Sequence, residues 1–135
     1  MRKKPHAVRC LTLILLCLLT TGCGSKDGLS RVKGKVTLNG QPLEGATVEF
    51  HPAGEGGAPS AGVTDAKGRY ELMYTFDTSG VAPGEHVVSI RTAETCFDDQ
   101  GNEFEREERV PAKYNTQTEL KRVVVPGRNT IDFEL

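Results

Sequence analysis

The chain has 135 residues, of which 37% are apolar and 26% are charged, and its formal net charge is -1. These values fit one globular domain and argue against a disordered, collagen-like or multi-span membrane protein. Residues 1–22 contain four basic side chains and no acidic one, so the remainder carries 13 basic against 18 acidic residues. A mildly acidic chain lacks the basic surface that phosphate backbones require, and we expect no nucleic-acid partner.

The N-terminus has the three-part pattern of a secretory signal. Basic residues at positions 2–4 precede a ten-residue apolar run at 10–19, and small residues follow it. This run is too short to cross about 30 Å of hydrocarbon as a permanent helix. We therefore expect residues 1–22 to be a signal peptide that is cleaved from the mature protein.

The residues that end this segment, Thr20-Thr21-Gly22-Cys23, resemble the bacterial lipobox, although Thr20 stands where Leu is usual. The resemblance implies that Cys23 carries acyl chains such as palmitate and becomes the new N-terminus of a lipoprotein. Several acyl chains hold a protein at a membrane much more firmly than one. Gly24, in place of the Asp associated with inner-membrane retention, implies an outer-membrane or periplasm-facing location in the cell envelope. The alternatives are a secreted protein cut near Gly22 and a disulfide at Cys23.

Residues 24–31 contain Gly, Ser, Lys and Asp, which is typical of a flexible tether. From residue 32 onward, apolar and polar residues alternate, which indicates half-buried strands. The alternating segments are 32–38, 46–51, 61–64, 69–74, 86–91, 120–125 and 130–135. Turn residues separate them and none has a helical period. Seven short strands at this spacing predict an all-β domain over 32–135, folded as an antiparallel Greek-key β-sandwich.

Several motifs together resemble the carboxypeptidase regulatory-like domain, a transthyretin-like or prealbumin-type fold. They are VxGxV at 32–36, GQPLxGAxVxF at 40–50, TDxxGxYxL at 64–72 and PGxxxVxI at 83–90. The following VPAKYN at 110–115, with a final strand pair, is similar to small lipoproteins of this family in planctomycete-type bacteria. The resemblance implies a seven-stranded sandwich that usually has no catalytic activity.

Few side chains in the mature chain are candidates for chemistry. His51 and His86 fall on opposite faces of their strands, which argues against a shared metal or acid–base site. If Cys23 carries lipid, Cys96 is the one cysteine left, and it lies in an expected loop between Glu94 and Asp98, where carboxylates disfavour a reactive thiolate. We expect no enzyme, cofactor or metal. An enzyme built around Cys96 or His86 and an intermolecular disulfide through Cys96 are the alternatives.

Two sites that related folds use also lack support in this sequence. An isopeptide bond, as in adhesin domains of related fold, would join Lys33 or Lys35 to Asn129, but both lysines fall on outward positions without the apolar surroundings that activate an amine. Hydroxyisourate hydrolase, an enzyme of the same fold, ends in a Tyr-Arg-Gly-Ser-type tail. Residues 131–135 read IDFEL instead, so the resemblance to that enzyme does not extend to its site.

Two loops, 54–60 and 94–109, are the expected contact regions for a protein or glycan partner, because function on rigid β domains tends to lie in loops. The second is acidic, with Phe97 and Phe104 as its expected apolar anchors. The oxygens of residues 98–103 suit Ca²⁺, so a small-ligand or Ca²⁺-binding lipoprotein that uses this loop is the alternative function. The sequence thus predicts a membrane-anchored surface lipoprotein whose β-sandwich is a structural or interaction module.

Overall fold

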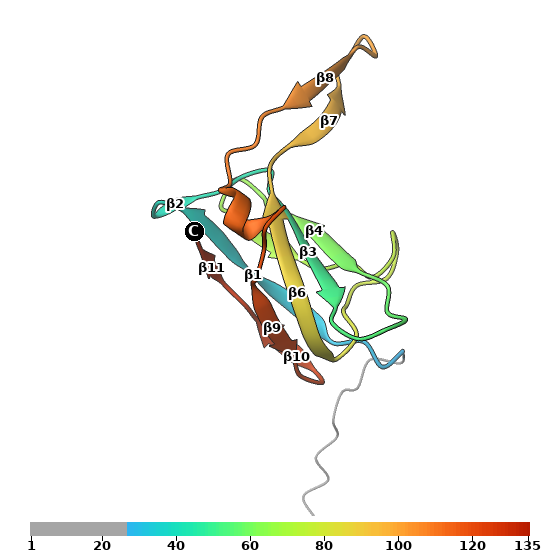
Figure 1. Cartoon of the computed structure of the whole chain (residues 1–135). Helices are drawn as coiled ribbons and strands as arrows, with labels where there is room; N and C mark the ends of the chain where they lie inside the picture. The colour runs from blue at the N-terminus through green and yellow to red at the C-terminus, as the bar shows by residue number, and fades with distance from the viewer. Residues whose placement is uncertain (1–26) are drawn as a thin grey trace, which may run out of the picture.

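Strands dominate the computed structural model, which describes residues 27–135 (Figure 1). They are β1 (Arg31–Leu38), β2 (Gln41–Pro42), β3 (Thr47–Pro52), β4 (Ser60–Val63), β5 (Arg69–Glu71), β6 (Gly84–Arg91), β7 (Glu94–Phe97), β8 (Glu103–Arg106), β9 (Lys121–Val124), β10 (Arg128–Thr130) and β11 (Phe133–Glu134). One 3₁₀ turn, η1 (Ala112–Tyr114), precedes β9. The all-β prediction is confirmed for these residues. The predicted signal peptide and Cys23 lie outside them.

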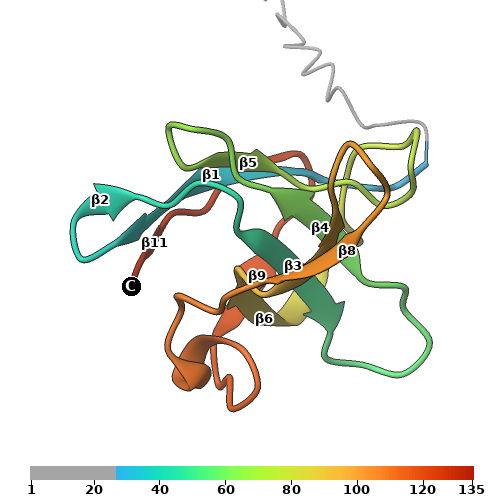
Figure 2. The ribbon, with the colours of Figure 1, turned by 90° about the horizontal axis from the view of Figure 1, so that it is seen from above.

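The strands form two larger sheets and a separate hairpin. The first sheet is built around β1, which pairs with β2, β5, β10 and β11. Both β5 and β10 pair with β1 at Lys33, so they flank its two edges. The second sheet has the order β4-β3-β6-β9 and is antiparallel throughout. Figure 2 shows the two sheets as separate layers, with β1 and β5 in one and β3, β6 and β9 in the other.

Buried apolar side chains fill the space between the two layers. From the first sheet come Val32, Val36 and Phe133, and from the second come Val48 and Phe50. The rings of Phe50 and Phe133 meet edge to face, with centroids 6.3 Å apart, so the sheets contact each other directly. The period-two pattern correctly predicted which residues of these strands point inward, because each sheet has one buried face.

The structure differs from the prediction in strand number and in strand direction. Residues 27–135 contain eleven strands instead of seven, several of them only two or three residues long. In addition, β1 pairs in parallel with β10 and β11, whereas the prediction was antiparallel throughout. The chain passes from the second sheet to the first between β9 and β10. There, β10 and β11 run alongside β1 in the same direction as β1. Alternation reports which face is buried and carries no information on the direction of a neighbour.

Regular pairing begins slightly earlier than the expected tether boundary. Ser30 forms a bridge with Val81, and β1 begins at Arg31. The last residues of the 24–31 segment are therefore part of the first sheet. Within residues 27–135, no helix is long and apolar enough to cross a bilayer.

A test of this packing is available at Gly34, in the middle of β1. A Cβ atom at this position would overlap the carbonyl oxygen of Ile131 and touch the ring of Tyr70. We expect Gly34→Ala to lower the free energy of unfolding by about 1–3 kcal/mol, as overpacking of a filled core does. Urea unfolding of a 24–135 fragment measures this, because the buried apolar side chains all lie between residues 32 and 133.

Gly54→Ala is the matched control for this substitution. Gly54 has open space around its Cα, and a Cβ atom there meets nothing within 4 Å. Its free energy of unfolding should stay within about 0.5 kcal/mol of the parent value. Equal stability of the two variants would contradict the close approach of residue 131 to β1.

Candidate interaction surface

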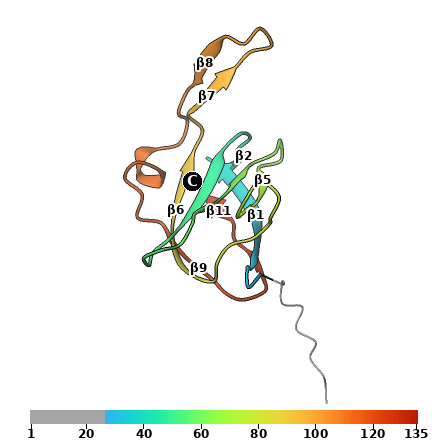
Figure 3. The same ribbon diagram turned by 90° about the vertical axis from the view of Figure 1, so that its right-hand side faces the viewer.

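The β7–β8 hairpin projects beyond the rest of the domain, at the end opposite to residue 27 (Figures 1 and 3). This segment was predicted to be a loop, and its two phenylalanines were predicted to be apolar anchors. Both predictions are wrong. The strands pair over four residues each, and the side chains of Phe97 and Phe104 are 66% and 51% exposed. Because the hairpin extends away from the two layers, neither ring has a core to enter.

The pairing register distributes the hairpin side chains over two faces. Phe97 lies opposite Glu103, and Thr95 lies opposite Glu105, so these four share one face. Thr95 also donates a hydrogen bond from its hydroxyl to the Glu105 carboxylate at 2.8 Å. The other face carries the pairs Cys96–Phe104 and Glu94–Arg106. One face therefore combines the Phe97 ring with two carboxylates, and the other combines the Phe104 ring with the Glu94–Arg106 pair.

Asp98 organises the turn at the tip. Its carboxylate accepts hydrogen bonds from the backbone N–H groups of Gln100 and Asn102, both at 2.8 Å, and from the Asn102 side chain at 2.9 Å. These bonds, that of the Asn102 side chain foremost, hold the pKa of Asp98 below its ordinary value. Within the described part of the chain, no three His, Cys, Asp or Glu side chains come together as metal ligands. The geometry of the tip therefore gives the Ca²⁺ alternative no support.

Glu108 closes the base of the hairpin. Its carboxylate accepts backbone N–H groups from Thr92 and Val110 at 2.9 Å and from Ala93 at 3.3 Å. The Thr92 hydroxyl lies 3.0 Å from the same carboxylate. Partial burial by itself raises the pKa of Glu108, but these hydrogen bonds outweigh it and the pKa is lowered. The segments that enter and leave the hairpin are thus joined through one charged group.

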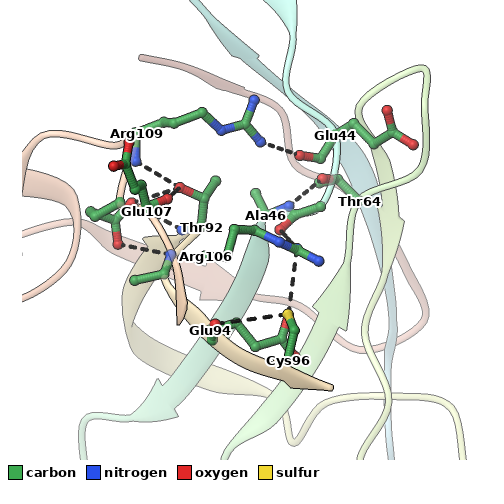
Figure 4. A network of polar contacts seen from close by, with 12 residues as sticks. Glu44, Ala46, Thr64, Thr92, Glu94, Cys96, Arg106, Glu107 and Arg109 are labelled. Carbon is green, nitrogen blue, oxygen red and sulfur yellow. Dashed lines mark hydrogen bonds and ion pairs between the residues drawn. The ribbon is translucent and has the colours of Figure 1, made fainter. Parts of the chain in front are cut away.

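Two arginines fix the hairpin to the body of the domain (Figure 4). Arg109 donates to the carbonyl oxygen of Glu44 at 2.6 Å, and Arg106 donates to that of Gly45 at 3.3 Å. Arg106 also lies 3.5 Å from the carboxylate of Glu94. These contacts tie β8 and the segment after it to the turn before β3. The hairpin therefore projects from the domain but is held in place at its base by these contacts; we call it the braced hairpin.

The predicted chemical candidates do not converge. His51 is exposed and lies 3.2 Å from the Glu49 carboxylate, whereas His86 is buried against Phe50 with Nε2 2.8 Å from the carbonyl oxygen of Ala82. They face opposite sides of the sheet, as predicted. Cys96 lies half-buried in β7, where a loop was expected, and its sulfur lies 3.8 Å from the Glu94 carbonyl oxygen.

The other candidate residues from the sequence, Asn129, Lys33, Lys35 and those of the 54–60 loop, lie at a turn, on an exposed strand face or in an exposed loop. The amide of Asn129 donates to the carbonyl oxygens of Val125 and Arg31 and so holds the β9–β10 turn. Lys33 and Lys35 are exposed on β1, as predicted from their outward positions. The 54–60 loop is exposed over residues 54–59 and carries one charged side chain and no large apolar one. The hairpin thus offers more varied contacts than this loop does.

The sequence predicted Glu108, Arg106 and Arg109 only as part of a charged, solvated stretch, and neither their role nor that of Thr92 in holding the hairpin was predicted. Thr92 and Glu108 are 16 residues apart, and each is common in exposed loops. The one available signal was indirect: a long polar segment with two Phe residues inside a domain of short strands. That signal does not say which residues hold the segment in place.

Comparisons with known proteins identify distant structural likenesses and no family. No protein-family model matches the chain, and no curated protein matches it in sequence. One similar solved structure is a 9R-lipoxygenase from Cyanothece PCC8801, with a TM-score of 0.40 and 17% identity over 81% of this chain and 16% of that one. A second is a DUF3823 family protein from Parabacteroides merdae ATCC 43184, with a TM-score of 0.42 and 16% identity over 78% of this chain and 44% of that one. A third is BcpA, the major pilin subunit of Bacillus cereus, with a TM-score of 0.43 and 13% identity over 77% of this chain and 29% of that one. This chain spans less than half the length of each, and likeness at this level assigns no activity.

Replacing Glu108 tests the closure of the hairpin base. Glu108→Gln removes the charge that strengthens these hydrogen bonds. Because the carboxylate is largely exposed to solvent, we expect the effect of losing this charge to be moderate. We expect the amide protection factors of Thr92 and Val110 to fall about five-fold, measured by hydrogen exchange. Glu107→Gln, an adjacent exposed residue with no side-chain hydrogen bond within 27–135, should leave them unchanged.

The same experiment has a pH dependence with a definite sign. The pKa of Glu108 is lowered in the fold from its ordinary value of 4.5. Its contribution is therefore complete above that value and is lost as the pH falls through the lowered pKa. The protection factors of the parent protein should approach those of Glu108→Gln in acid. A difference between the two that persists after the carboxylate is protonated would contradict this assignment.

Proposed function

We propose that this protein is a cell-envelope lipoprotein whose domain is a non-catalytic protein-interaction module. The observation that carries the proposal is the braced hairpin, which presents Phe97 and Phe104 to solvent at the end of the domain remote from residue 27. Exposed aromatic rings surrounded by charged groups are typical of protein contact surfaces.

The proposed anchor is a lipid on Cys23, which lies outside the described residues. The basic, apolar and small-residue segments before Cys23 support it, as does the lipobox resemblance. An anchor before residue 27 attaches the domain at the end opposite to the hairpin. The hairpin is then the part of the domain most remote from an outer-membrane or periplasm-facing attachment point.

We infer that the fold is a transthyretin-like β-sandwich of the carboxypeptidase regulatory-like type. Support comes from the two facing layers, the contact between Phe50 and Phe133, and the order of the motifs along residues 32–90. In this assignment, the seven predicted segments correspond to β1, β3, β4, β5, β6, β9 and the pair β10 with β11. The dispersed positions of His51, His86 and Cys96 agree with a role without catalysis.

The anchor is tested by Cys23→Ala in the full chain. Without the thiol that accepts the lipid, the precursor should remain unprocessed and should leave the detergent-extractable membrane fraction, as judged by its mass and by fractionation. Cys17→Ala keeps an apolar residue in the signal segment and is the control, which should be processed normally. Normal processing and fractionation of Cys23→Ala would refute lipidation at this residue.

The contact surface is tested by truncating its rings. We expect Phe97→Ala, on the face that also carries Glu103 and Glu105, to reduce photo-cross-linking of the hairpin to its partner in intact cells by at least ten-fold, because a central aromatic contact contributes about 2 kcal/mol or more. Phe104→Ala, on the opposite face, should reduce it less. Phe76→Ala is the matched control, since Phe76 is fully exposed on another loop. The melting temperature should not change in any of them. Identical cross-links in all three variants would exclude the hairpin as the contact surface.

A further inference from the structure

The outer face of the first sheet carries a row of cations, and one carboxylate, that of Glu71, lies opposite Lys33 in the strand register. Arg31, Lys33 and Lys35 alternate along β1 and are all exposed. Arg128 on β10 lies directly opposite Arg31 in the register. None of these four side chains forms an ion pair within residues 27–135. Like charges placed opposite each other on a sheet are unfavourable, and a bound anion relieves the repulsion.

The surface is hollow along this row. One pocket of about 200 Å³ and a second of about 310 Å³ meet at Lys33. Their lining contains five cationic and two acidic side chains: Arg31, Lys33, Lys35, Arg69 and Arg128, with Glu71 and Asp132. We call these two pockets, which share Lys33 in their lining, the cationic trough. It runs along β1, between β5 and β10. Arg69 is paired with Asp65 at 2.8 Å, whereas the other four cations form no ion pair within residues 27–135.

The hairpin of the same protein has the complementary chemistry. Residues 94–109 contain seven carboxylates against two arginines. Glu103 and Glu105 lie on one face of β8 and form no ion pair within the described structure. Alternate residues of a strand are about 6.6 Å apart, so these two carboxylates have the same spacing as Lys33 and Lys35 on β1.

The trough cannot be filled by the hairpin of its own chain. Arg31 begins β1 at the end of the domain remote from the hairpin (Figures 1 and 3). The bonds from Arg106 and Arg109 to the turn at 44–45 prevent the hairpin from folding back. The complementary hairpin must therefore come from another molecule. Because the two surfaces differ and lie at opposite ends of the domain, one such contact joins two copies head to tail.

We propose that the acidic hairpin of one copy docks into the cationic trough of a second copy, so that the protein associates with itself head to tail. This rests on the proposed function, since it names the partner of the hairpin. A flat anionic membrane fits the trough less well, because Glu71 and Asp132 lie within it and would face the same negative surface. A discrete row of carboxylates can instead pair with the cations between them.

A charge swap tests the proposal on the mature lipidated protein. Two differently tagged copies are expressed together, isolated membranes that contain both are chemically cross-linked at about 0.05 M salt and then extracted in a neutral detergent, and the fraction of one copy captured with the other is measured. Wild-type copies should capture each other, and about 0.5 M salt during cross-linking should abolish this. Lys33→Glu/Lys35→Glu alone and Glu103→Lys/Glu105→Lys alone should each lower capture at least ten-fold, because like charges then meet at the contact.

Co-expression of the two variants should restore capture, since each reversed surface then meets a complementary one. Lys67→Glu/Glu119→Lys, at exposed positions without side-chain bonds within 27–135, is the control with unchanged net charge and should behave as wild type. Circular dichroism checks that each variant is folded. If an unrelated partner or misfolding caused the loss of capture in each variant alone, mixing the two variants would not restore capture.

Absence of wild-type capture, or failure of the mixed variants to restore it, overturns the inference. If capture is absent while Phe97→Ala still removes cross-links in cells, the hairpin has a different partner, and only the self-association is refuted. If the hairpin variants change nothing either, the proposed function fails as well. Flotation with vesicles of phosphatidylcholine and phosphatidylglycerol that depends on Lys33 and Lys35, without restored capture in the mixture, would assign the trough to lipid and overturn the inference.

Discussion

The hydrogen bonds to the Glu108 carboxylate hold together the two segments from which the hairpin rises, and the exposed surface depends on them. A two-stranded hairpin that stands alone in water is marginally stable, because it has no buried face. Here, Thr92 and Val110 are joined to one carboxylate at the base, and Arg109 ties the same segment to the Glu44 carbonyl. The strands therefore keep their register although Phe97 and Phe104 contribute little burial. A surface held this way loses less conformational entropy when it binds a partner.

The sequence predicted the strands that have one buried face and missed those that have none. Val48 and Phe50 alternate with polar residues because one side of β3 faces the core, and this pattern is visible without a structure. In β7 and β8, neither face is buried, so no apolar row exists to mark the strands. A large ring in a polar segment predicts an anchor in a core, but Phe97 has no core within reach and stays exposed. The bonds at Glu108 join residues 16 apart, and no local pattern encodes them.

The small net charge of the chain conceals a separation of charge between its surfaces. The hairpin segment is strongly acidic, whereas the face around Arg31 and Arg128 places guanidinium groups opposite each other. Stability alone would not favour this pair, because like charges in register repel. The same arrangement is useful where an acidic group has to be attracted. A charged surface that lowers the stability of the free protein, and that has a surface of opposite charge to bind, is typical of a binding site.

Confinement at a membrane strengthens association between copies through ion pairs of this kind. An exposed ion pair contributes only about 0.2–1 kcal/mol, so two or three of them bind weakly between molecules in dilute solution. Copies anchored through Cys23 share one surface, which raises their effective concentration without any new contact. A heterologous contact also leaves one hairpin and one trough unoccupied at the ends of each assembly. Weak pairing is then an advantage, since assemblies on the membrane can grow and dissociate as the local density of the protein changes.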